Sequence, residues 1–125
     1  MVKSLTAIFI AALLLLGAGL FEWGFVSNEF GDFEEELQTL YDKSEERTAN
    51  CEDAKAVRVS WEERKTRLHV WIPHNDITKI DDYLSEAVKL VGEREYSLAH
   101  SKLEILIHLC EALPDTYRPG IENIF

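Results

Sequence analysis

The most constraining feature of the chain is an uncharged stretch near its start, residues 4–21, made mostly of Leu, Ile, Phe and Ala. A helix of about 20 apolar residues spans the hydrocarbon core of a bilayer, and about 18 are the usual minimum. Lys3 precedes the stretch, and Glu22 and Trp23 follow it. We therefore expect residues 1–26 to form an N-terminal transmembrane helix that contacts membrane lipid, with Trp23 as an aromatic anchor at the interface.

A cleaved signal sequence is the alternative interpretation, because it also begins with a positive charge and an apolar run. Gly17, Ala18 and Gly19 supply the small residues that a cleavage site needs. The apolar run is longer than the usual signal-peptide core of about 7–15 residues, which favours an uncleaved anchor.

The charges that flank the apolar stretch predict its orientation. Lys3 and the terminal amine lie before it, whereas seven acidic residues follow before the first cation, Lys43. By the positive-inside rule, the N-terminus is cytoplasmic and residues 27–125 form an extracytoplasmic domain. The expected product is a single-pass protein of the cell membrane.

The charge balance restricts the partners of that outer domain. The chain has 23 Asp and Glu against 13 Lys and Arg, a formal net charge of −10, and nearly all of the acidity lies after residue 26. An acidic surface repels phosphate backbones, so we expect no nucleic-acid partner. About a hundred residues suffice for one small domain.

Apolar residues recur at helical spacing throughout the outer domain. The four stripes are Phe30, Phe33, Leu37, Leu40 and Tyr41; Ala54, Val57, Trp61, Leu68, Trp71 and Ile72; Ile77, Ile80, Leu84, Val88 and Val91; and Tyr96, Ala99, Leu103, Leu106, Ile107, Cys110 and Leu113. The connections between them are short, which favours up-down order. The sequence therefore predicts an all-α protein, in which a transmembrane helix is followed by a small up-down bundle of about four helices.

Prolines and polar residues suggest where these helices begin and end. Pro73 should end the second helix near Ile72, because the residue before a proline is pushed out of helical geometry. Asn75 or Asp76 can cap the start of the third helix by accepting a hydrogen bond from a free backbone amide. Gly92 should end the third helix, and Pro114 should close the fourth.

The two cysteines and one tryptophan give further structural expectations. In up-down order Cys51 begins the second helix and Cys110 nearly ends the fourth, so they should lie at opposite ends of the bundle. A disulfide requires Cα atoms within about 7 Å, and we therefore expect two free thiols, with Cys110 buried. Trp61 lies on an apolar stripe and should belong to the core.

Several local patterns together resemble one protein family. They are the surroundings of Trp61 and Trp71, the step His74-Asn75-Asp76-Ile77, the helix start Ser97-Leu98-Ala99 and the closing Glu122-Asn123-Ile124-Phe125. The chain is similar, over essentially its whole length, to the bacterial domain-of-unknown-function family 4363. The resemblance implies a small protein with an N-terminal membrane segment and a helical outer part. It implies no activity, cofactor or catalytic residue.

Catalytic signatures are absent from the sequence. It has no Gly-rich phosphate loop, no Gly-x-Ser-x-Gly elbow and no His-Glu-x-x-His zinc pair. The four histidines lack the usual metal-ligand spacing. His74 with Asn75, Asp76, Asp81 and Asp82 is the best cluster of titratable groups, and an acidic helix start explains it without any ligand. We expect no enzyme, no cofactor and no metal site.

Two functions are compatible with the sequence. The first is an anchored interaction module that docks on another membrane or envelope protein. The alternative is an extracytoplasmic domain that senses a ligand or an ion. Up-down order brings an apolar cluster to the membrane side of an otherwise acidic domain, and such clusters mark contact surfaces. This possible contact surface consists of Trp71, Ile72, His74, Ile121, Ile124 and Phe125. The alternative is that the C-terminal tail only folds back to cover the open end of the bundle itself.

Overall fold

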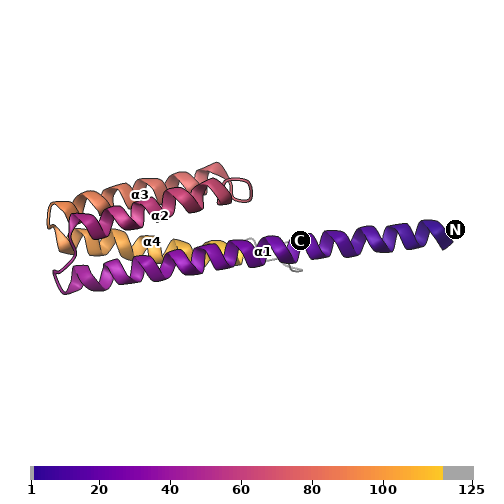
Figure 1. The fold of residues 1–125 in the computed structure, drawn as a ribbon, viewed down its shortest axis with the longest axis horizontal. Coiled ribbons are helices and arrows are strands. Elements are labelled where there is room, and N and C mark those ends of the chain that lie inside the picture. Colours follow the sequence, from indigo (N-terminus) through magenta and orange to yellow (C-terminus); the bar gives the residue numbers. More distant parts are fainter. Residues whose placement is uncertain (1, 117–125) are drawn as a thin grey trace.

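The computed structural model describes residues 2–116, which form four helices and no strand. The helices are α1 (Val2–Glu45), α2 (Cys51–Leu68), α3 (His74–Gly92) and α4 (Tyr96–Thr116). Successive helices run in opposite directions (Figure 1). The predicted all-α, up-down bundle is therefore confirmed.

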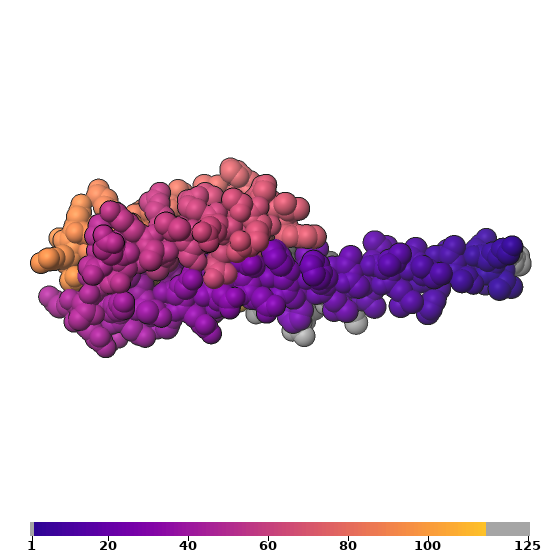
Figure 2. Space-filling model, viewed as in Figure 1, coloured from indigo at the N-terminus to yellow at the C-terminus, as the bar shows by residue number. Residues whose placement is uncertain are grey.

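The apolar N-terminal segment and the first bundle helix form one unbroken helix, α1. Its 44 residues correspond to about 66 Å at 1.5 Å per residue. The first buried residue of α1 is Val26, residues 22–25 are partly buried, and residues 2–18 are exposed and project from the bundle (Figure 2). By length and composition, this helix is the one among the described residues that could cross a membrane.

The bundle core is built from residues that alternate three and four positions apart. On α1 the buried positions are Val26, Phe30, Phe33, Leu37, Leu40 and Ser44; on α3 they are Ile77, Ile80, Leu84, Ala87 and Val91; on α4 they are Ala99, Leu103, Leu106, Cys110 and Leu113. A strict three-and-four alternation is the heptad pattern of left-handed coiled-coil packing. Each of these three helices therefore contributes one narrow and mainly apolar stripe to the core.

The four helices form a ring; among its four neighbouring pairs, α1 and α4 pack most extensively and α1 and α2 least. Trp61 of α2 is 1% exposed and stacks on Phe33 of α1, with ring centroids 5.1 Å apart. Its predicted place in the core is confirmed. Both cysteines are free thiols, Cys51 exposed at the start of α2 and Cys110 buried in α4, as the helix order predicted.

The corners of the bundle at the end away from the apolar half of α1 are fixed by local hydrogen bonds. Asn50 and Asp53 form a capping box at the start of α2. Arg47 and Arg94 follow α1 and α3 with φ of 60°, in the left-handed conformation usually taken by glycine. In the second of these turns the amide of Glu95 donates to the carbonyl of Leu90 at 2.9 Å.

Three helix boundaries differ from the sequence prediction. α2 ends at Leu68 instead of near Ile72, because the chain already turns there, with the Trp71 and Ile72 amides both donating to the Leu68 carbonyl. The cap predicted for the third helix was wrong. Pro73 occupies the N-cap position without a side-chain hydrogen bond, and its φ of −56° suits a helix start.

The predicted end of the last helix was also wrong, because Pro114 lies inside α4, which continues to Thr116. A proline within a helix removes one backbone donor. Gly92 ends α3 as predicted.

Candidate functional site: the seam between α1 and α2

Polar side chains connect α1 and α2 at regular intervals. Lys43 Nζ lies 3.1 Å from Asp53 Oδ1, the Ser60 hydroxyl donates to Glu36 Oε2 at 2.5 Å, and Arg67 Nη2 lies 3.1 Å from Glu29 Oε2. Successive pairs are seven residues apart on both helices. We call these three pairs the polar ladder; they fix the antiparallel register of α1 and α2.

Arg64 occupies a core position in this seam. It fills the gap between Trp61 and Leu68 in the α2 stripe, where the heptad spacing calls for an apolar residue, and its side chain is only 13% exposed. Its Nη1 lies 3.0 Å from Glu29 Oε2, and its Nη2 lies 3.5 Å from Glu36 Oε1. The sequence analysis missed this residue; the interrupted heptad was the signal that pointed to it.

The arginines set the protonation of Glu29. Burial alone would raise the pKa of this carboxyl, but hydrogen bonds from Arg67 and Arg64, together with their charges, lower it below the ordinary value of 4.5. Glu29 is therefore ionised at neutral pH, and its charge is compensated within the seam.

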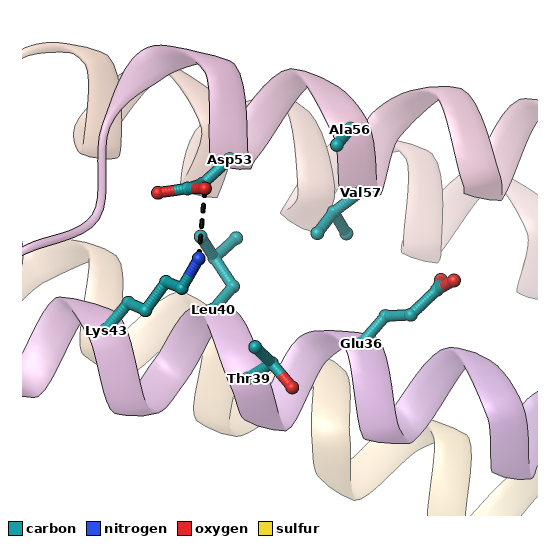
Figure 3. A pocket seen from close by; sticks show the side chains of 7 residues that line it. All are labelled: Glu36, Thr39, Leu40, Lys43, Asp53, Ala56 and Val57. Carbon is teal, nitrogen blue, oxygen red and sulfur yellow. Dashed lines mark hydrogen bonds and ion pairs between the residues drawn. The ribbon is translucent and has the colours of Figure 1, made fainter.

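A groove of about 240 Å³ lies between α1 and α2 (Figure 3). Its floor contains the buried side chains of Leu40 and Val57. The Lys43–Asp53 pair crosses it at one end, and Glu36 lies at the other. Thr39 and Ala56 complete the wall. The groove thus has an apolar floor and a charged rim.

The solvent face of α1 beside this groove is acidic. Asp32, Glu35 and Asp42 are exposed and lie on the same face as Thr39, at helical spacing of three and four residues. A surface that approaches the groove from outside therefore meets a row of negative charge.

The cluster of titratable groups around His74, which the sequence analysis considered as a metal site, does not form a site here. Its residues take part in other contacts or are exposed. Asp81 accepts a hydrogen bond from Trp61 Nε1 at 2.6 Å and lies 3.4 Å from Lys65 Nζ. His74 and Asn75 are exposed in the first turn of α3. Among the described residues, no three His, Cys, Asp or Glu side chains come together in a group that could hold a metal ion.

Only part of the predicted contact surface lies within the described residues. Trp71 is 36% exposed and His74 is exposed, whereas Ile72 is 3% exposed and packs in the core, so its side chain does not contribute to an outer surface. Ile121, Ile124 and Phe125 lie outside the described residues. Val70, 69% exposed, was not anticipated, because it lies on no apolar stripe.

A second cluster of titratable groups lies between α1 and α4. Burial raises the pKa of the Cys110 thiol to about 12, with smaller contributions from the charges of Glu34 and Glu111. Burial also raises the pKa of Glu34, and its hydrogen bond to Glu111 raises it further. The thiol is therefore neutral and poorly nucleophilic, since the thiolate is the reactive form.

Comparison with known proteins gives one family match. The model of a family described as a domain of unknown function (DUF4363) matches residues 26–124. No curated protein and no solved structure matches the chain. The matched region begins at Val26, the first buried residue of α1, so it coincides with the start of the bundle.

Proposed function

Since its model covers most of the sequence, the chain belongs to the DUF4363 family, as the resemblance predicted, and on this premise we propose that it is a membrane-anchored interaction module. In this proposal the apolar half of α1 spans the cell membrane with its N-terminus in the cytoplasm. The bundle lies outside and docks on another membrane or envelope protein. The observation that carries the proposal is the groove between α1 and α2, with its apolar floor and charged rim.

The direction of the groove favours a partner in the same membrane. α1 supplies one wall of the groove and continues without a break into the apolar segment. The groove therefore runs parallel to the membrane-spanning helix and opens sideways. A helix that rises from the membrane beside this protein can lie along it, with one side chain of the partner over Leu40 and Val57.

The charges beside the groove favour a basic partner surface. Asp32, Glu35 and Asp42 form the exposed row on α1, in a chain whose formal net charge is −10. Complementary charge steers encounter and suppresses wrong partners, more than it adds affinity. We therefore assign the groove to a helical segment of a membrane or envelope protein whose facing side carries Lys or Arg.

Site-specific photo-crosslinking in intact cells tests this assignment. A photoreactive residue at position 39, inside the groove, should give one discrete adduct with a membrane or envelope protein. The matched control carries the same residue at position 98 of α4, where Leu98 is 56% exposed and lines none of the grooves described above. Glu35→Lys with Asp42→Lys should weaken the adduct at position 39 and leave the melting temperature unchanged. Equal adducts at positions 39 and 98 would refute a groove-specific partner.

Topology is tested separately. A reporter enzyme that is active only outside the cytoplasm should be active when fused after Phe125, and the product should retain residues 1–26. Activity from a cytoplasmic reporter alone would reverse the orientation. A mature chain that begins near Leu20 would replace the anchor by a cleaved signal sequence.

A further inference from the structure

The turn between α2 and α3 exposes two large apolar side chains. Val70 is 69% exposed and Trp71 is 36% exposed, whereas the next residue, Ile72, is 3% exposed and anchors the turn in the core. The turn lies at the end of the bundle from which the apolar half of α1 projects (Figure 1).

The polar ladder gives the height of this turn along α1. Its last pair joins Arg67 to Glu29, and the two helices run in opposite directions. Trp71 follows Arg67 by four residues, and the amides of Trp71 and Ile72 still bond the Leu68 carbonyl as in a helical turn. Trp71 therefore lies at about the height of Phe25, four residues before Glu29 on α1.

This height falls within the interfacial layer of a bilayer. Residues 4–21 of α1, the uncharged stretch, span about 27 Å, close to the thickness of about 30 Å of the hydrocarbon core, so Phe21 marks its outer edge. Phe25 lies four residues, or about 6 Å, beyond that edge. The headgroup region on each side is about 5–7 Å thick, and this is where Trp is enriched.

The charge pattern of the turn differs from that of the rest of the bundle. From Arg67 to Asn75 the sequence contains no acidic residue, and it contains Arg67, His69 and His74. Both histidines are exposed. A segment without negative charge is not repelled by anionic headgroups, in contrast to the acidic face of α1.

We propose that the α2–α3 turn is a bilayer-contact surface, in which Val70 and Trp71 insert into the headgroup layer of the membrane that α1 spans. The proposal rests on the anchor in the proposed function and is independent of any protein partner. The bundle then has two attachments to the membrane, the span of α1 and this turn. Lipid is the favoured occupant over a partner's juxtamembrane surface, because the ladder places the turn within the layer itself.

Spin-label accessibility tests the proposal with the full chain in phosphatidylcholine vesicles, where no partner protein is present. A nitroxide is attached to Val70→Cys in a Cys51→Ser background, and the remaining Cys110 is buried. The water control is Val59→Cys, 57% exposed on α2 and about 16 Å from the turn along the helix axis. The hydrocarbon control is Leu13→Cys, 52% exposed on α1.

Collision with oxygen and with a water-soluble nickel chelate reports the depth of each label. We expect the label at position 70 to be several-fold less accessible to nickel than the label at 59, and shallower than the label at 13. Equal nickel accessibility at 70 and 59, with the label at 13 in hydrocarbon, would overturn the bilayer contact and leave the anchor standing. Nickel access at position 13 would overturn both.

Discussion

Arg64 Nη1 on α2 lies 3.0 Å from Glu29 Oε2 on α1, at a position where the heptad repeat of α2 calls for an apolar side chain. The pair is one of the few charged contacts of the bundle that solvent barely reaches, with side-chain exposures of 13% and 16%. It joins α1 and α2, which pack least among the neighbouring helix pairs of the ring. The pairing of α1 with α2 therefore depends on polar contacts more than that of the other neighbours does.

Arg64→Ala should lower the free energy of unfolding by about 1–3 kcal/mol, the range for losing a hydrogen bond to a charged group and leaving its partner buried. Arg64→Met should cost less, because it keeps volume at the heptad position and Arg67 still pairs with Glu29. Urea unfolding of the full chain in detergent checks both variants. A loss below about 0.5 kcal/mol for Arg64→Ala would place the pair among ordinary surface ion pairs.

Trp61→Ala should destabilise the bundle by about 3–5 kcal/mol, as expected for a buried aromatic side chain replaced by a cavity. Trp61→Phe keeps the stacking on Phe33 but removes the hydrogen bond from Nε1 to Asp81, and should cost about 1 kcal/mol. The same unfolding measurement separates the two contributions. A loss under about 1 kcal/mol for the alanine variant would contradict the core assignment.

Glu29 and Glu34, two carboxyls whose pKa values are shifted in opposite directions, should affect the pH dependence of stability in opposite ways. Glu29 has a lowered pKa, so its stabilising contribution is present above the ordinary value of 4.5 and is lost as the pH falls through the folded-state value. Glu34 has a raised pKa, so its ionisation destabilises the fold, and this penalty disappears as the pH falls from the folded-state value toward 4.5.

Glu29→Gln should therefore be less stable than the parent chain at neutral pH, and Glu34→Gln should be more stable. Both differences should shrink toward pH 4.5 or below, as read from urea midpoints across this range. Glu35→Gln, an exposed neighbour on α1, serves as the control. A neutral-pH loss of stability in Glu34→Gln would contradict a raised pKa of Glu34 in the folded protein.

The two thiols should differ strongly in reactivity. Cys51 is exposed at the start of α2, whereas the Cys110 thiol is buried and its pKa is raised to about 12. One equivalent of maleimide should react rapidly with the native protein, and the second only when urea unfolds it. Mass spectrometry of the labelled peptides checks this, and a disulfide between the two cysteines would refute the helix order.

Gly31→Ala should raise the free energy of unfolding by about 0.5–1 kcal/mol, because alanine is the better helix former. A Cβ built at Gly31 meets no other atom within 4 Å. The control is Gly92→Ala at the end of α3, where the Cβ would approach the Cys51 sulfur at 3.8 Å, an ordinary contact. A destabilised Gly31→Ala variant would show that another surface covers this face of α1 in the purified protein.

The sequence predicted the helices well, because Leu84, Leu103 and their neighbours recur at three-and-four spacing that only a helix places on one face. It failed where a residue occupies a position that its residue type does not usually take. Arg64 is charged yet lies in the core, since two glutamates on another helix compensate it, and a one-dimensional pattern does not show them. Pro73 was interpreted as the end of one helix, although its fixed φ equally suits the start of the next.

The candidate surfaces were harder to predict than the fold. The groove at Leu40 and Val57 arises from how closely α1 and α2 approach, which no spacing rule gives. Val70 and Ile72 are both apolar neighbours of Trp71, yet one is exposed and the other buried. The conformation of the turn determines which of the two side chains is buried, and the sequence pattern does not give that conformation.

Because α1 is continuous, a change in the packing of the bundle would reach the apolar half of the helix. From Val26 to Ser44 the packing holds α1 to a repeat of seven residues in two turns, whereas an undistorted α-helix drifts by about 20° per heptad from that repeat. Nothing in the apolar half imposes the same repeat. Tightening or loosening the bundle therefore rotates the apolar half about its long axis, by about 20° for each heptad that changes. In the proposed membrane anchor, such a rotation would change which residues face a neighbouring helix in the lipid, while the height of the bundle stays the same.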